Sequence, residues 1–153
     1  MRHSNRAHVA GIVFAALPVL AVVSCSEGRD PGQRPGAEGV REVIPLYTRA
    51  LADGDGSKAC SLMSMAAQEA LAKRTVNDGC LQSVQTVADG LDPASAVALR
   101  EVKMKDPQVD GSSATVELQL NPSQQGAIDA LGSTTLSLVQ IDERWHIDAL
   151  SAE

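Results

Sequence analysis

The sequence predicts an α+β domain whose helices come first and whose antiparallel sheet comes second. Before Pro93, apolar residues recur with the three-to-four-residue spacing of amphipathic helices. After Pro93 the spacing changes to two. Ala114, Val116, Leu118 and Leu120 then alternate with polar residues, as in a strand with one buried and one solvated face. The order of the two patterns indicates helices packed on one face of a sheet.

The first helix is expected to begin near Glu38 and to stop at Gly54, because glycine commonly ends helices. Pro45 must lie in its first turn or kink it, since proline lacks an N–H and its ring clashes with the preceding turn. One apolar stripe predicts the buried face of this helix: Val40, Val43, Ile44, Tyr47 and Leu51.

Further helices are expected up to residue 88. Asp55 or Ser57 can cap a short helix, and residues 64–73 are rich in helix formers. A break at residues 77–79 precedes a last amphipathic helix, which is expected to end at Gly90 and the following Asp-Pro pair. Its apolar face comprises Cys80, Leu81, Val84, Val87 and Ala88.

About four strands are expected to form the sheet. Residues 97–109 predict a long, irregular strand, and Pro107 places it at a sheet edge or a bulge. Asp110-Gly111 predicts the turn of a hairpin with the next strand. A polar loop follows at 121–132, with one helical turn around 127–131. The last two strands are expected at residues 134–141 and 145–150, joined by a tight connection at 142–144.

The first 24 residues have the pattern of a signal peptide. A basic start with Arg2 and Arg6 precedes an apolar run at 9–23, which is 15 residues long. That is shorter than the roughly 20 residues of a membrane span and typical of the apolar part of a signal peptide. The alternative, an ordinary buried helix, does not explain the basic start.

The end of this run resembles the bacterial lipoprotein signal. Val22-Val23-Ser24-Cys25 supplies two aliphatic residues, a small residue and then the cysteine. The resemblance implies cleavage before Cys25 and a diacylglyceryl group on its thiol, so that acyl chains anchor the protein. The expected location is therefore the outer face of the cell membrane. The alternative is a secreted protein with a free N-terminal thiol.

Three regions follow from these observations. Residues 1–24 are the expected signal peptide. Residues 25–37 are an expected flexible tether, because residues 26–37 carry Pro-Gly pairs and too little apolar surface to fold. Residues 38–153 are the expected domain.

Export also bears on Cys60 and Cys80, which are the only cysteines left if Cys25 is lipidated. An oxidising compartment favours a disulfide between them. Closing a loop of this size stabilises a fold by roughly 3 kcal/mol. The alternative is two buried free thiols.

The motif order is similar to the nuclear transport factor 2-like fold, as found in small lipoproteins of high-GC Gram-positive bacteria. The quoted pieces are a helix ending in YTRALADGD, a helix with KACSLMS, a later helix bearing a cysteine, the hairpin VDGSSATVELQL and the closing ERWHIDAL. The resemblance spans roughly residues 38–150. It implies a cone, in which a curved sheet wraps around helices and often encloses a cavity. It also implies that dimerisation through the sheet is an option. Relatives include ketosteroid isomerases, polyketide cyclases and binding modules, so the fold does not give the function.

Three residues are weak candidates for catalysis. Tyr47 lies on the first helix, where the resemblance to isomerases implies an oxyanion-binding tyrosine, but it also belongs to the apolar stripe. His146 and Asp148 share one face of the last strand and can form a base with its orienting carboxylate. The alternative is a solvated polar face opposite a buried Trp145 and Ile147.

Several site classes lack support in the sequence. The segment from Asp53 resembles the start of a calcium loop, but Lys58 and Ser64 replace the glycine and the glutamate that such loops need. Removing Arg2 and Arg6 from the 13 basic residues leaves 11 against 19 acidic residues, a net charge of −8. That charge and the scarcity of aromatics disfavour nucleic-acid binding. No cofactor and no metal are expected.

These observations favour a non-catalytic module that binds a ligand or another protein of the cell envelope. A small apolar ligand in the cone cavity, an envelope protein and a second copy of the chain are the expected partners, beside the membrane held through Cys25. The alternative is a small-molecule enzyme of the isomerase or cyclase type that uses the cone cavity.

Overall fold

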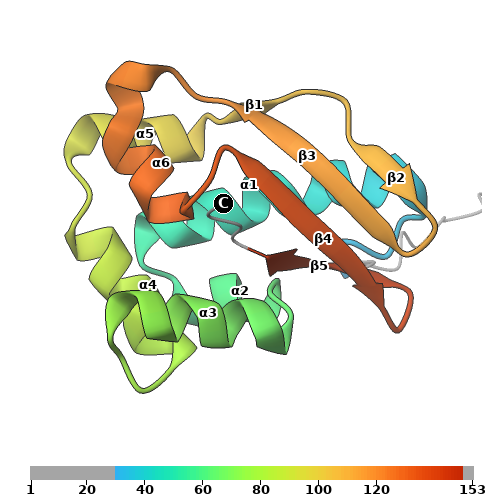
Figure 1. Cartoon of the computed structure of the whole chain (residues 1–153), viewed down its shortest axis with the longest axis horizontal. Helices are drawn as coiled ribbons and strands as arrows, with labels where there is room; N and C mark the ends of the chain where they lie inside the picture. Colours follow the sequence, from blue (N-terminus) through green and yellow to red (C-terminus); the bar gives the residue numbers. More distant parts are fainter. Residues whose placement is uncertain (1–29, 150–153) are drawn as a thin grey trace, which may run out of the picture.

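The computed structural model describes residues 30–149, and the chain forms helices packed on one face of a curled sheet (Figure 1). The helices are α1 (Gly36–Asp53), α2 (Gly56–Ser61), α3 (Met65–Thr75), α4 (Cys80–Asp89), α5 (Pro93–Arg100), the 3-10 helix η1 (Pro122–Gln124) and α6 (Gln125–Leu131). The strands are β1 (Lys103–Met104), β2 (Gln108–Asp110), β3 (Ser113–Gln119), β4 (Thr135–Ile141) and β5 (Arg144–Ala149). The α+β prediction is confirmed.

The sheet is antiparallel throughout, in the order β1-β3-β4-β5. The short strands β1 and β2 pair with successive parts of β3 on the same side, so the sheet is four strands wide. The far edge of β5 is covered, because the Ser64 N–H donates to the Ile147 carbonyl at 2.7 Å and the Ile147 N–H donates to the Leu62 carbonyl at 2.8 Å. This leaves β1 and β2 as the outer edge strands.

The core lies between α1 and the inner face of the sheet. The predicted stripe of α1 is wholly buried, and so are the alternating residues of β3 and both Trp145 and Ile147 on β5. Burial of this much apolar surface is the main favourable term in folding. The inner face consists of Ala114, Val116, Leu118, Leu136, Leu138, Trp145 and Ile147.

The end of α1 and the start of α2 lie where the sequence predicts them, but Pro45 does not lie in the first turn of α1. Gly54 ends α1 with a left-handed φ of 68°, and the Asp55 carboxylate caps α2 by accepting from the Lys58 N–H at 3.0 Å. Helix α1 begins earlier than expected, at Gly36. Pro45 therefore lies in the helix interior, where one backbone hydrogen bond is missing, and a first-turn position is wrong.

The predicted disulfide is present. Cys60 of α2 and Cys80 at the start of α4 are bonded, with their Cα atoms 6.1 Å apart. This distance is within the usual range for disulfides. The bond ties the short second helix to the fourth helix, as the sequence suggested, and the alternative of two free thiols is wrong.

The prediction of one long strand at residues 97–109 is wrong. The first part of this segment belongs to α5, and only β1 and β2 form strands. Asp92 starts this helix instead of ending the previous one, because its carboxylate accepts from the backbone N–H groups of Ala94 and Ser95 at 2.9 and 3.0 Å. Pro93 occupies the first helical turn, where its missing N–H costs nothing. Pro107 interrupts the strand at the sheet edge, as expected.

The polar loop expected at 121–132 is also mostly helical. Asn121 and Gln124 form a reciprocal capping box at the start of η1, and α6 follows directly. Gly132 ends α6 with a φ of 81°. The helical part is therefore longer than the single turn predicted from residues 127–131.

The expected tether is shorter than residues 25–37. From Asp30 onward the chain packs on the domain: Gly32 is buried and its carbonyl accepts from the Trp145 N–H at 3.1 Å. The other residues of the expected tether, the signal peptide and the end of the last predicted strand at Leu150 lie outside the described residues. Within residues 30–149, no helix has both the length and the apolar character needed to cross a membrane.

Candidate functional site

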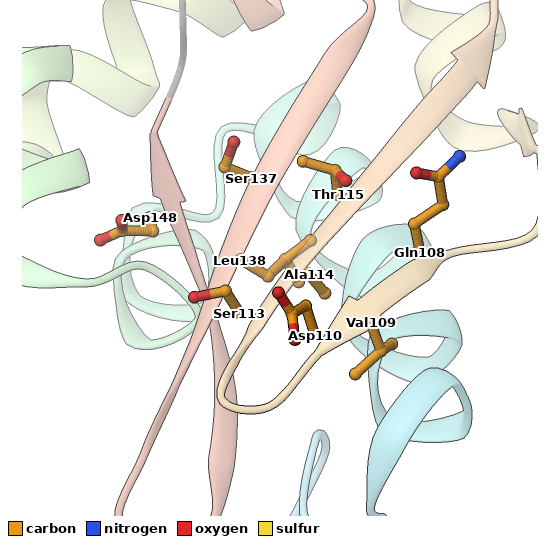
Figure 2. Close-up of a pocket in the computed structure, with 9 residues that line it drawn as sticks. All are labelled: Gln108, Val109, Asp110, Ser113, Ala114, Thr115, Ser137, Leu138 and Asp148. Atoms are coloured by element: carbon orange, nitrogen blue, oxygen red, sulfur yellow. The ribbon is translucent and has the colours of Figure 1, made fainter.

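A hollow of 490 Å³ lies on the outer face of the sheet, opposite the face that packs on α1 (Figure 2). Pockets that hold small molecules typically measure about 300–1,000 Å³. Polar side chains of β2, β3, β4 and β5 surround this hollow, with buried residues beneath them. The lining residues are Gln108, Val109, Asp110, Ser113, Ala114, Thr115, Ser137, Leu138 and Asp148.

Strand register brings these polar side chains together. Gln108 pairs with Thr115, and Thr115 pairs with Ser137, so the three form one row across β2, β3 and β4. Asp110 pairs with Ser113 in the next row along. Side chains directly opposite each other have Cβ atoms about 4.5–5.5 Å apart. One amide, three hydroxyls and a carboxylate therefore gather on a single face.

The lining is rich in hydrogen-bond acceptors and contains no basic side chain. Asp110 and Asp148 supply carboxylates, which only accept hydrogen bonds, whereas serine and threonine hydroxyls both donate and accept. A ligand with N–H or O–H donors can satisfy such groups. A positive charge on that ligand adds attraction to the two carboxylates.

Asp148 connects the hollow to the helical layer. It lies at an irregularity in the pairing of β4 with β5, where the register shifts next to Ser137. Its Oδ1 accepts a hydrogen bond from the Ser64 hydroxyl at 2.9 Å, and the same hydroxyl accepts from the Ala67 N–H at 3.1 Å. Ser64 is thereby the N-cap of α3. Asp148 consequently orients a helix cap as well as lining the hollow.

His146 lies beside the hollow and does not line it. It is half-buried and pairs with Val139, whose other neighbour is Ser113. Burial lowers the pKa of His146, and the positive charge of Arg144 lowers it further. Its Nδ1 has no hydrogen-bond partner among the described residues. Asp148 bonds to Ser64, and no hydrogen bond joins His146 to Asp148 among the described residues, so the weak candidate pair of a base and its orienting carboxylate is not formed.

Tyr47 lies inside the core and is fully buried. Its hydroxyl has no hydrogen-bond partner within residues 30–149. Burial raises the pKa of Tyr47 to about 12, against the opposing effect of the Arg74 charge. Arg74 in turn donates to the Ala130 carbonyl at 2.6 Å and so links α3 to α6. Tyr47 is thus buried together with the other residues of the apolar stripe of α1.

The three candidate residues thus do not converge. Tyr47 is on the inner side of the sheet, while His146 and Asp148 are on the outer side. Cys25 lies outside the described residues, so its lipidation stays a prediction. No group of three or more His, Cys, Asp or Glu side chains in residues 30–149 is placed to hold a metal ion.

Family models, curated proteins and solved structures were each compared with this chain, and none of the three comparisons returned a match. The resemblance to the nuclear transport factor 2-like fold therefore stays a prediction.

Sequence reasoning missed most of the hollow. Ser113 and Thr115 lie on the strand whose alternation the sequence shows, and Ser137 lies on the strand expected at residues 134–141. The signal available was that small polar residues recur on the outer face of these two strands. Gln108 and Asp110 could not be added, because residues 97–109 were assigned to one long strand. The correct register depends on β2 being short and separate.

Proposed function

We propose that this chain is a lipid-anchored lipoprotein of the outer face of the cell membrane, and that its nuclear transport factor 2-like domain is a non-catalytic binding module. The proposed binding site is the hollow on the outer face of the sheet. The proposed ligand is a small polar molecule or side chain that carries several hydrogen-bond donors and a positive charge.

The position of the hollow is the observation that carries this proposal. The residues between α1 and the sheet, including Ile44, Tyr47 and Trp145, are fully or almost fully buried. A ligand on the inner side would have to displace them, and an apolar ligand would need such an inner cavity. The outer hollow is open and needs no such displacement.

The anchor is tested by changing Cys25→Ser in the full chain. Cells that express either form are labelled with a radioactive fatty acid. The wild-type protein is expected to take up label, because Val22-Val23-Ser24-Cys25 provides the site, and the variant is expected to take up none. Equal label on both proteins would contradict the proposed anchor.

The hollow is tested by titrating the protein with spermidine, a polyamine, and following backbone amide shifts. Shifts are expected at residues 113–115 and 137–138. The change Asp110→Asn removes a lining carboxylate, whereas Asp129→Asn removes a carboxylate on α6 that is also exposed and does not line the hollow. Loss of binding in the first variant alone supports the site. Equal loss in both, or shifts spread over the whole acidic surface, would show charge attraction without a site.

The buried Tyr47 hydroxyl is the observation that favours the enzyme alternative, since an unpaired buried polar group requires an explanation. The change Tyr47→Phe removes that hydroxyl and keeps the ring. If Tyr47 is core, the variant should be as stable as the wild type or more stable by up to about 1 kcal/mol, because no hydrogen bond is lost. Urea melts measure this change. If the enzyme alternative holds, turnover of a steroid isomerase substrate by the wild type should disappear in the variant.

A further inference from the structure

Residues 30–35, which we term the strap, are fastened to the domain at several points although their composition predicted a free tether. The Trp145 N–H donates to the Gly32 carbonyl at 3.1 Å, and the Gly32 N–H donates to Glu42 Oε2 at 3.3 Å. Arg34 Nε lies 2.8 Å from Glu42 Oε1. Asp30 forms an ion pair with Arg144. The strap therefore joins both α1 and β5.

Two glycines make this docking possible. Gly32 has a φ of +84°, and a Cβ there would lie 2.8 Å from Val43 Cγ2 and 3.0 Å from the Trp145 carbonyl oxygen. A Cβ on Gly39 would lie 2.1 Å from the Arg34 carbonyl oxygen. Only glycine fits such close approaches without a shift of the backbone. The sequence is thus adapted locally to hold the strap against the domain.

The strap leads the chain out at one particular end of the domain. Asp30 meets Arg144, the first residue of β5, directly after the turn between β4 and β5. The turn between β2 and β3 lies at the same end, because the Gln140 N–H donates to the Ser112 carbonyl at 2.7 Å. Figure 1 shows the β2–β3 turn and the β4–β5 turn at the same end of the sheet. Helix α6 precedes β4 and lies at the opposite end.

We infer that the end of the sheet with these two turns faces the lipid surface, with the hollow beside it. This inference rests on the proposed anchor at Cys25. Asp30 lies five residues after Cys25, and five residue steps span at most about 18 Å when fully extended. The seven residues of β4 alone extend about 24 Å. The segment from Cys25 to Asp30 is therefore too short to reach from one end of the sheet to the other.

The covalent link imposes this orientation without adhesion to the lipid. Asp110, Asp142 and Glu143 make the turns acidic and exposed, and anionic lipid headgroups repel such groups. The domain is then held close to the surface but not bound flat on it. Asp110 and Ser113 line the hollow at this same end, so the partner of the hollow is a donor-rich, cationic group presented at the membrane surface.

The orientation is tested in cells with the full chain and a photoreactive benzoylphenylalanine at one position. Ser112 in the β2–β3 turn and Asp129 on α6 are both exposed and are replaced one at a time. After irradiation, cross-linking to radiolabelled phospholipid is measured, and fatty-acid labelling of Cys25 is measured in the same samples. Cross-linking is expected to be several-fold stronger from position 112 than from position 129.

Two variants test the role of the strap. A long Gly/Ser insertion after Ser26 leaves the domain untouched, and Gly32→Val opposes docking. Both are expected to remove most of the excess cross-linking at position 112, and the insertion suffices if Gly32→Val does not fold. Equal cross-linking at both positions in a fatty-acid-labelled protein overturns this inference alone, and so does an excess that survives the insertion. Absence of the label overturns the proposed anchor as well.

Discussion

The two faces of β5 differ in what they contribute. On the inner face, Trp145 and Ile147 are 1% and 0% exposed and pack against the helices. On the outer face, His146 and Asp148 are half-buried, and Asp148 accepts a hydrogen bond from the Ser64 hydroxyl. Both faces alternate along the same six residues. The core and the candidate site therefore lie on opposite sides of one strand, so single substitutions can separate their effects on stability and on binding.

The largest expected effect is that of Trp145→Ala on the inner face. Tryptophan-to-alanine changes in a core typically cost about 3–5 kcal/mol, against a total of roughly 5–15 kcal/mol for domains of this kind. The free energy of unfolding from urea melts should fall by a corresponding amount. His146→Ala, on the opposite face of the same strand, is the matched control and should change it little.

A Trp145→Ala protein as stable as the wild type would contradict the assignment of Trp145 to the core. It would mean that the inner face tolerates a cavity where the largest side chain of the core stands. The inner face of β5 would then not be the face that stabilises the fold, and the hollow could no longer be treated as separate from the core.

The next effect concerns the helical layer that covers the inner face. Replacing Cys60 and Cys80 together by alanine opens a loop with a sequence separation of 20. The expected loss is roughly 3 kcal/mol, mainly because the unfolded chain gains freedom. Thermal melts of the double variant measure it. A melting temperature equal to that of the wild type would show that α2 and α4 are held by packing alone.

The Ser64–Asp148 hydrogen bond connects the outer face of β5 to the helical layer. Ser64→Ala removes the cap of α3 and should cost about 1 kcal/mol. Asp148→Ala should cost less, because the cap hydroxyl remains. The double variant should cost less than the sum of the two, since both changes remove the same hydrogen bond. Strictly additive urea melts would mean that Asp148 does not orient the cap.

The inner face could be predicted from the sequence because its signal is local. Alternation by two placed Val116, Leu118, Trp145 and Ile147 inside, and all four are buried. Turn chemistry located Gly54 and the hairpin after Asp110 in the same way. Such patterns depend only on neighbouring residues, so they can be identified in the sequence before the fold is known.

The outer hollow could not be predicted, because it depends on register between strands far apart in sequence. Gln108 pairs with Thr115, which in turn pairs with Ser137. This register requires β2 to be a strand separate from β1. Asp92-Pro93 was interpreted as the end of one helix, although the same pair is a good start for another. Because of that ambiguity, residues 97–100 of α5 were predicted as part of a strand, and β2 was predicted to be longer than its three residues.

The strap was missed for a different reason. Its glycines and prolines predicted freedom, yet glycine also permits close contact with a backbone. Gly32 lies close to β5, where its carbonyl accepts a hydrogen bond from the Trp145 backbone N–H at 3.1 Å. Composition cannot distinguish the two roles, because the partner of Gly32 lies more than a hundred residues away in the sequence.

The smallest expected effect is the pH dependence that His146 gives to the outer face. Burial, and then the Arg144 charge, lower the pKa of His146 below its ordinary value of 6.5. The unfolded chain therefore binds a proton more readily than the folded domain. Stability is fully present above pH 6.5 and falls as the pH drops from there toward the folded-state pKa.

Urea melts over this pH range, for the wild type and for His146→Gln, isolate the contribution of His146 from that of the carboxylates. The wild type should lose slightly more stability on acidification than the variant, because only the wild type has this imidazole to protonate. The effect should be far smaller than that of Trp145→Ala, since solvent reaches the half-buried ring and moderates both the burial cost and the repulsion from Arg144. Parallel curves for the two proteins would show that His146 is as well solvated in the folded state as in the unfolded one. The outer face of β5 would then carry no buried polar cost, and the contrast with the inner face would be complete.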